Sequence, residues 1–191
     1  LEILQGIGKW AAHIEQPADA PWQVAQAFQA MQSGRPGVVS LQASWDFFTR
    51  SAAVRMQPPL ALQPTPPVDT DAVEQAAKLL SAAKAPMIFV GSGALEASAE
   101  VGQLAEVLGA PVVSFRGGRG VVADDHPLGF TVAAGARLWP QTDVAVVIGS
   151  RFELLDIRWR HRPAGLKLIR IDIDPAEVRR IAAEVSLLAD A

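Results

Sequence analysis

The hydrophobic pattern of the chain from about residue 69 onward alternates between two kinds of segment. Apolar runs without polar alternation are typical of strands buried on both faces, and apolar residues three and four apart are typical of helices. The apolar runs occupy residues 87–90, 111–115, 143–148, 168–173 and 186–189. The helical spacing is carried by Val73, Ala76, Ala77 and Leu80 and by Val101, Leu104, Ala105 and Leu108. Because strands alternate with helices, the pattern predicts βαβ units, and therefore a parallel sheet with helices on both faces.

Capping residues indicate where the predicted helices begin and end. An aspartate or threonine within residues 69–71 can cap the first helix, and Gly109 closes the second. The segment Asp174-Pro-Ala-Glu177 predicts a third helix, with Asp174 as its N-cap and proline at the first helical position. Residues 121–140 carry no clear pattern, so we expect an irregular segment there.

The first 48 residues contain fewer elements. Apolar residues at helical spacing follow Pro21 and stop before Gly34, which predicts a helix, and residues 37–41 predict a short strand. One helix and one strand are too little for an independent core. Prolines are dense between Arg50 and Thr70, which predicts an extended linker because proline restricts φ and lacks a donor. We therefore expect a first segment at 1–48, a linker at 49–68 and a domain at 69–191.

Composition and charge narrow the class of protein. Half of the 191 residues are apolar and 19% are charged, which is typical of a soluble globular protein. The net charge of −3 argues against a nucleic-acid-binding protein. The absence of cysteine excludes disulfides, thiol catalysis and thiolate metal sites. No apolar run approaches the roughly 18 residues that span a bilayer, and the N-terminus lacks the pattern of a signal peptide, so we expect a cytoplasmic protein without membrane association.

The histidines and the segment Arg158-Trp-Arg-His-Arg162 indicate little chemistry. His13, His126 and His161 are scattered without the spacing of metal ligands, so we expect no metal site. The segment at 158–162 is basic and aromatic, a combination that can bind single-stranded nucleic acid. It is short and its surroundings are not basic, so a surface loop or a subunit contact explains it better. No serine lies in a nucleophile-elbow pattern, and no catalytic residue is predicted.

The candidate binding residues follow the ends of the predicted strands, where ligands bind in open parallel sheets. Glycine allows close approach of a backbone to a ligand, arginine binds phosphate, and aspartate can accept bonds from ribose hydroxyls. The candidates are Gly91 and Gly93, then Arg116, Gly117 and Gly118, then Arg151, and finally Asp172 and Asp174. Each also has a structural alternative, since glycines form turns, strand-end arginines are often solvated, and Asp174 can serve as a helix cap.

Gly91-Ser-Gly93 does not complete the dinucleotide-binding fingerprint. The position of its third small residue is occupied by Glu96, and Phe115 and Arg116 stand where an acidic residue for the ribose is expected. The nicotinamide-binding form of the fold is therefore disfavoured.

Several segments, taken in order, resemble one family of enzymes. They are Gly34-Arg-Pro-Gly-Val-Val-Ser-Leu41 with Trp45-Asp46, the proline-rich linker, Ala85-Pro-Met-Ile-Phe-Val-Gly-Ser-Gly93, Gly149-Ser-Arg-Phe152 and Ile171-Asp-Ile-Asp-Pro175. This set resembles the thiamine diphosphate-dependent enzymes of the acetolactate synthase and benzoylformate decarboxylase group. The resemblance implies that residues 1–48 are the C-terminal part of a pyrimidine-binding domain and that 69–191 form a central domain. That domain is expected to be a Rossmann-like α/β fold with a six-stranded parallel sheet flanked by helices.

The resemblance also implies a parent enzyme larger than this chain. Such a lyase or transferase decarboxylates a 2-keto acid, or joins the resulting carbanion to a second substrate, with thiamine diphosphate and Mg²⁺. The family's activating glutamate would lie before Leu1, and the Gly-Asp-Gly sequence that holds Mg²⁺ does not occur here. The chain also begins without methionine. We therefore expect a fragment that is inactive alone, whose partners are the missing pyrimidine- and diphosphate-binding domains in a homodimer or homotetramer.

A bound nucleotide is left open by the resemblance, because central domains of this family bind FAD, ADP or nothing. Two stretches depart from the pattern of the FAD-binding members, namely Gly129-Phe-Thr-Val-Ala-Ala-Gly135 and Glu153-Leu-Leu-Asp156. We therefore expect a structural or nucleotide-binding role for the central domain, with FAD disfavoured. The alternative is a stand-alone FAD-, ADP- or NAD-binding module on a similar sheet.

Overall fold

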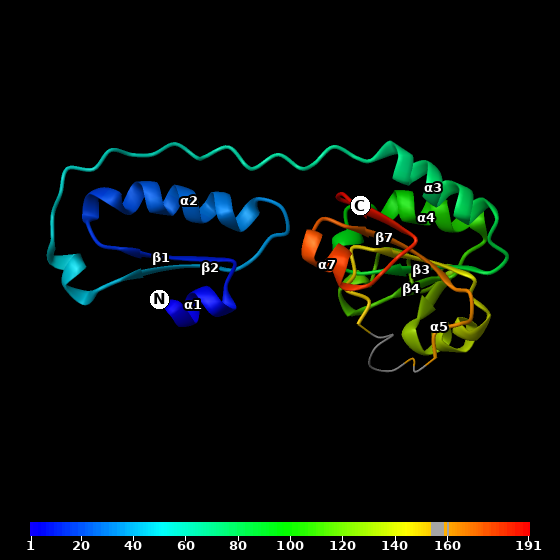
Figure 1. Cartoon of the computed structure of the whole chain (residues 1–191). Coiled ribbons are helices and arrows are strands. Elements are labelled where there is room, and N and C mark those ends of the chain that lie inside the picture. The colour runs from blue at the N-terminus through cyan, green and yellow to red at the C-terminus, as the bar shows by residue number, and fades with distance from the viewer. Residues whose placement is uncertain (154–158, 160) are drawn as a thin grey trace. The chain divides into compact units, whose positions relative to one another are not determined.

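The computed structural model describes residues 1–153, 159 and 161–191 (Figure 1). These residues divide into two units, Leu1–Thr65 and Pro66–Ala191. All of residues 50–69 are described, and they form neither helix nor strand, as the density of prolines predicts.

The first unit is built around a two-stranded parallel sheet. Its elements are α1 (Glu2–Ile7), β1 (Trp10–Ile14), a 3-10 turn at Pro17–Asp19, α2 (Ala20–Gln32), β2 (Val39–Ala43) and a 3-10 turn at Trp45–Thr49. Trp10 pairs with Val39, and α2 packs on both strands. The predicted helix and second strand are confirmed, but the expectation of one helix and one strand was wrong. The sequence of β1 is Trp-Ala-Ala-His-Ile, in which alanine and histidine separate the two large apolar side chains, so it shows only a weak strand pattern.

The second unit contains a six-stranded sheet whose strands are all parallel, in the order β5-β4-β3-β6-β7-β8. The strands are β3 (Pro86–Val90), β4 (Val112–Ser114), β5 (Gly129–Thr131), β6 (Val144–Ile148), β7 (Lys167–Asp172) and β8 (Val185–Leu188). The helices are α3 (Thr70–Ser81), α4 (Ser98–Leu108), α5 (Val132–Leu138) and α7 (Pro175–Arg180). This confirms the six-stranded parallel sheet flanked by helices.

The segment expected to be irregular contains β5 and α5, and that expectation was wrong. β5 has three residues, Gly-Phe-Thr, so it is too short to show a pattern along the sequence. It forms because its backbone pairs with β4, from Val112 opposite Gly129 to Ser114 opposite Thr131. α5 follows at once, capped by the Thr131 hydroxyl, which accepts a bond from the amide of Ala134 at 3.3 Å.

The residues that the sequence predicts to cap the other helices do so in the structure. The carboxylate of Asp69 caps α3 by accepting a bond from the amide of Ala72 at 3.1 Å. Asp174 caps α7 in the same way, through the amide of Ala176 at 2.9 Å. Gly109 ends α4 in the left-handed conformation, with φ of +58°, which glycine adopts without steric cost.

Both faces of the sheet are covered, as Figure 1 shows, by α3 and α4 on one side and α5 on the other. On the first side, the strands pack against small helix residues such as Ala76 and Ala105. On the second side lies an aromatic cluster, which we define as Phe89, Phe115, Trp139, Phe152 and Trp159. Full burial of one phenylalanine contributes about 1.5–3 kcal/mol, so this cluster is a major part of the core.

Trp159, the aromatic residue of the 158–162 segment, lies within the aromatic cluster. Its ring lies 5.6 Å from that of Phe89 and 5.2 Å from that of Trp139, measured between centroids. The indole of Trp139 in turn donates a hydrogen bond to the carbonyl of His161 at 2.8 Å. The tryptophan therefore packs against the core. Arg158 and Arg160 lie outside the described residues.

Asp143 fixes the point where β3 and β6 begin side by side. Its carboxylate accepts bonds from the amides of Lys84 at 2.7 Å and Ala85 at 3.0 Å. Burial acts to raise the pKa of this carboxyl, but the amide bonds outweigh burial and hold the pKa below its ordinary value. A carboxyl with a lowered folded-state pKa stabilises the fold above its unfolded pKa, and this stability is lost as the pH falls through the folded pKa.

We therefore expect Asp143→Ala to lower the free energy of unfolding of the second unit by about 1–2 kcal/mol near pH 7. The difference from the unsubstituted protein should shrink as the pH falls below the ordinary value of 3.8, because protonation removes the same interaction. Urea unfolding at a series of pH values measures both effects. Asp124→Ala, which removes an exposed carboxylate, is the control and should change little. An unchanged free energy of unfolding for Asp143→Ala at pH 7 would contradict the assignment.

Candidate functional site

The centre of the sheet has the topology at which open α/β folds bind ligands. β3 and β6 are neighbours, and the chain continues from β3 toward β4 and β5 on one side and from β6 toward β7 and β8 on the other. The order of strands thus reverses between β3 and β6, and a crevice is expected at the carboxyl ends of these two strands. The candidate binding residues lie in the turns that follow β3, β4, β6 and β7, except Asp172, which is the last residue of β7.

The structure brings the candidate glycines into direct contact with one another and with Gly149. A Cβ atom built on Gly91 would lie 2.3 Å from the carbonyl oxygen of Gly149, and one on Gly93 would lie 2.8 Å from its Cα. A Cβ on Gly118 would lie 2.4 Å from the carbonyl oxygen of Val90. We call Gly91, Gly93, Gly118 and Gly149 the glycine cluster. Its members are glycines because backbone packs on backbone there.

Hydrogen bonds tie these turns together. The amide of Gly91 donates to Ile148 at 3.0 Å, that of Gly93 to Gly149 at 3.1 Å, and that of Gly149 to Ile171 at 2.9 Å. Gly149 adopts φ of +54°, a conformation in which a side chain would be strained. The turns after β3 and β6 are therefore parts of one packed joint.

The fourth predicted glycine and the neighbouring arginine are less constrained. A Cβ on Gly117 would lie 3.0 Å from the Cβ of Ser92, a contact that a small shift relieves. Arg116 is exposed at the start of a 3-10 turn, Arg116–Gly118. The structure thus places both residues beside the glycine cluster without giving either a defined partner among the described residues.

Arg151 is held by carboxylates. Its guanidinium lies 3.4 Å from the carboxylate of Glu153 and 3.5 Å from that of Glu177 on α7. Arg180 bonds the same Glu177 at 2.8 Å and also donates to the backbone carbonyl of Arg151. The charge that the sequence offers for a phosphate is therefore already opposed by two acids. Glu177 and Arg180 were missed as contributors to this edge, because their proximity to Arg151 depends on how α7 packs.

Asp172 and Asp174 both act within their own turn. Asp172 is nearly buried, and its carboxylate accepts a bond from the amide of Asp174 at 3.0 Å. Asp174 caps α7 as described above. Arg170, two residues earlier on β7, is completely buried and lies 3.9 Å from the carboxylate of Asp172. Sequence reasoning missed Arg170, although a charged residue inside the apolar run at 168–173 was the available signal.

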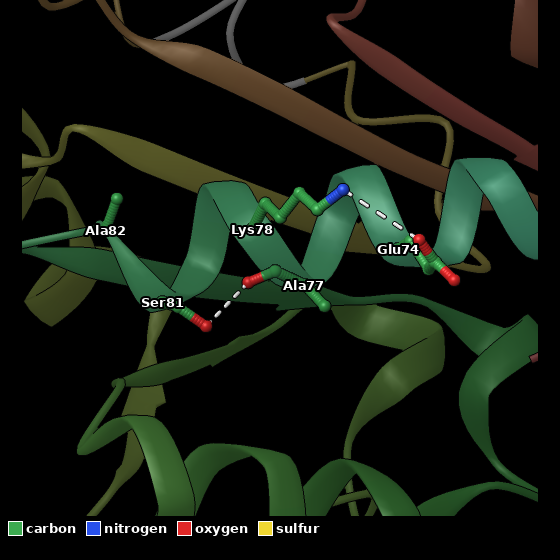
Figure 2. Close-up of a pocket in the computed structure, with 5 residues that line it drawn as sticks. All are labelled: Glu74, Ala77, Lys78, Ser81 and Ala82. Atoms are coloured by element: carbon green, nitrogen blue, oxygen red, sulfur yellow. Dashed lines mark hydrogen bonds and ion pairs between the residues drawn. The ribbon is translucent and has the colours of Figure 1, made fainter.

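A hollow on the described surface lies elsewhere, along the outer face of α3 (Figure 2). Glu74 and Lys78 form an exposed ion pair there at 3.8 Å, and the Ser81 hydroxyl donates to the carbonyl of Ala77 at 2.8 Å. These are the interactions of an ordinary solvated helix face. None of the predicted site residues lines this hollow.

The described residues contain neither a cluster suited to a metal ion nor a helix that could span a membrane. In that part of the chain, no group of three or more histidine, cysteine, aspartate or glutamate residues is arranged to hold a metal ion. No helix among the described residues is long and apolar enough to cross a membrane.

Sheet order, switch point and glycine turns together define an open parallel α/β domain of the kind that surrounds nucleotides in many enzymes. Comparison with known proteins makes the class specific. The model of the family described as thiamine pyrophosphate enzyme, central domain, matches residues 73–191. The chain therefore belongs to the family of thiamine pyrophosphate-dependent enzymes and contains their central domain.

Individual relatives agree with this assignment. An acetolactate synthase of Mycobacterium bovis is 33% identical over 186 residues, which cover 90% of this chain and 30% of the relative. A protein of Pseudomonas aeruginosa named as a probable 2-ketoarginine decarboxylase is 32% identical over 165 residues, covering 83% of this chain and 29% of the relative. A solved structure from Mycobacterium smegmatis, classed as a thiamin diphosphate-dependent enzyme, superimposes with a TM-score of 0.73 at 25% identity. It matches 96% of this chain, which spans 37% of that structure.

These comparisons confirm the resemblance to the acetolactate synthase group. The chain spans about a third of the length of the proteins that it matches. A stand-alone FAD-, ADP- or NAD-binding module receives no support from them, since the matches named above are an acetolactate synthase, a probable 2-ketoarginine decarboxylase and a thiamin diphosphate-dependent enzyme.

The glycine cluster makes a direct prediction about stability. Gly91→Ala should lower the free energy of unfolding of the second unit by about 1–3 kcal/mol, because overpacking displaces a backbone that cannot yield. Gly102→Ala is the matched control, since a Cβ at Gly102 meets nothing within 4 Å in the middle of α4. The control should raise the free energy of unfolding by about 0.5–1 kcal/mol. Thermal and urea unfolding measure both. Equal effects of the two substitutions would show that the turns after β3 and β6 are not packed as described.

Proposed function

We propose that this chain serves as the central part of a thiamine diphosphate-dependent enzyme that decarboxylates a 2-keto acid or transfers the resulting carbanion. The observation that carries the proposal is the match of residues 73–191 to the central-domain family, together with relatives of which the chain spans about a third. In this proposal the chain is not catalytic by itself, and the reacting groups belong to other domains.

The described residues do not fit a site for thiamine diphosphate and Mg²⁺. A divalent cation on a diphosphate needs several oxygen ligands, and no acidic cluster suitable for a metal occurs in the part of the chain that the structure describes. We therefore place the cofactor and its metal in the pyrimidine- and diphosphate-binding domains of the parent. The chemistry supplied there is stabilisation of a carbanion, and in this proposal the central domain, residues 69–191, holds none of the reacting groups.

The central domain, in our proposal, has a structural role and holds no nucleotide. The members of the glycine cluster contact each other, so their lack of side chains serves packing without reference to a ligand. The guanidinium of Arg151 is opposed by Glu153 and Glu177, and a phosphate brought to it would meet these carboxylates. Like charges at such distances repel. Both arguments weigh against FAD and against ADP at this edge.

The first unit supports a role within a larger assembly. Parallel sheets are almost always covered on both faces, and two strands alone are not independently stable. Yet Ile3 and Ile7 of α1 are each 80% exposed, and Val38 beside β2 is 74% exposed. We propose that other parts of the parent protein cover these residues. On the resemblance, we also propose that the parent is a cytoplasmic homodimer or homotetramer.

The catalytic part of the proposal is tested by comparing this chain with the longer parent protein. With thiamine diphosphate, Mg²⁺ and a panel of 2-keto acids, the 191-residue chain should release no CO₂ and should bind no cofactor in a calorimetric titration. The parent should do both. Decarboxylation by the 191-residue chain would refute the proposal that the reacting groups belong to other domains. A parent inactive toward the whole panel would refute the proposed activity.

The structural role is tested by titrating the chain with FAD and with ADP. We expect no saturable binding and no change in the melting temperature. The guanidinium of Arg151 is already paired with Glu153 and Glu177, and the backbones of the glycine cluster pack on one another. Arg151→Ala is a useful companion, since a nucleotide site at this edge would lose affinity on that substitution. Stoichiometric yellow FAD on the purified protein, or ADP binding that weakens in Arg151→Ala, would overturn the proposal.

A further inference from the structure

Arg170 is a cation enclosed in the core. It lies on β7 between Val147 of β6 and Ser186 of β8, and its exposed fraction is 0%. One nitrogen, Nη2, donates a hydrogen bond to the backbone carbonyl of Ser150 at 3.0 Å. The other two, Nε and Nη1, have no hydrogen-bond partner among the residues that the structure describes.

Unbonded donors of this kind are rare inside proteins. Buried polar groups almost always have a partner, and where no protein atom supplies one, an ordered water commonly does. The carboxylate of Asp172 lies 3.9 Å from Nη2 of Arg170, which is too far for a direct hydrogen bond.

The charge around Arg170 favours a neutral ligand over an anion. Burial lowers the pKa of this guanidinium, Asp172 raises it, Arg180 lowers it and Glu177 raises it again. The two acids already oppose the buried charge, so an added anion would meet their repulsion. Water brings donors and acceptors without adding charge.

The bond from Arg170 also holds a strained turn. Phe152 has φ of +57°, a conformation that is unfavourable for a bulky residue and needs support from its surroundings. Its amide donates to the Ser150 hydroxyl at 3.3 Å, while its ring is buried 4.7 Å from that of Phe89. Arg170 fixes the carbonyl of this same Ser150. The turn that directs Phe152 into the aromatic cluster is thus hydrogen-bonded to β7 through Arg170.

We propose that Arg170 is a positioning residue that binds ordered water within the core through Nε and Nη1 and, through Nη2, anchors the turn at Gly149–Phe152. The water completes the hydrogen bonding of a cation that would otherwise be buried with unmet donors. The anchor sets the path of the backbone that carries Arg151 toward Glu177.

Nuclear magnetic resonance of the whole chain tests the water. The Nε–H of Arg170 should give a signal protected from exchange with solvent, assigned by its loss in Arg170→Lys, and this signal should show a cross-peak to water. Addition of inorganic phosphate should leave its position unchanged. A protected signal without contact to water, or a saturable shift with phosphate, would overturn the assignment of water as the ligand.

Substitution tests the anchor. Arg170→Met keeps much of the side-chain volume but removes every donor, so we expect the melting temperature to fall by about 5 °C and the amide signals of residues 150–152 to move. Arg179→Met, on the exposed face of α7, is the control and should change neither. A rise in melting temperature for Arg170→Met would show a dry and unfavourable buried charge. If that variant does not fold, the same signals measured in Arg170→Lys decide the question.

Discussion

The close approach of backbones between the ends of β3 and β6 is the constraint on which the rest of the second unit depends. Gly91 and Gly93 pack on Gly149, and Gly118 packs on Val90, at distances that leave no room for a Cβ atom. Because these contacts join the turns of three strands, they fix where each neighbouring side chain can lie. These contacts lie at the switch point of the sheet, where a ligand is usually expected.

The charged side chains near the carboxyl ends of β6 and β7 form ion pairs with one another. Glu177 on α7 bonds Arg180 and lies beside Arg151, while Asp172 lies near the buried Arg170. The pairs of Arg151 and Arg180 with Glu177 are partly exposed and contribute little each, so their importance is positional. They hold α7 over the turn after β6 and leave no uncompensated arginine for a phosphate among the candidate residues of that turn. Packing and electrostatics therefore both support the proposal that the central domain of this member of the thiamine pyrophosphate-dependent enzyme family has a structural role.

The sequence predicted those parts of the fold whose signals are local. The apolar runs of β3 and β6 and the caps Asp69 and Asp174 could be recognised because each is determined by a few neighbouring residues. β1 and β5 could not, since their short mixed sequences become strands only through pairing with distant segments. The candidate site was limited in the same way. Its glycines and acids were found, but the ion pairs with Glu177 and the anchor at Arg170 depend on three-dimensional packing.

Hydrogen exchange of individual amides tests most directly whether the turns after β3 and β6 form a packed joint. The amides of Gly91, Gly93 and Gly149 are all bonded across the strand ends. If the joint is structural, these amides should exchange only when the whole second unit unfolds, with protection close to that of β3 and β6. If instead they exchange rapidly, as the turns of an open binding crevice do, the central claim of a closed architectural edge is contradicted.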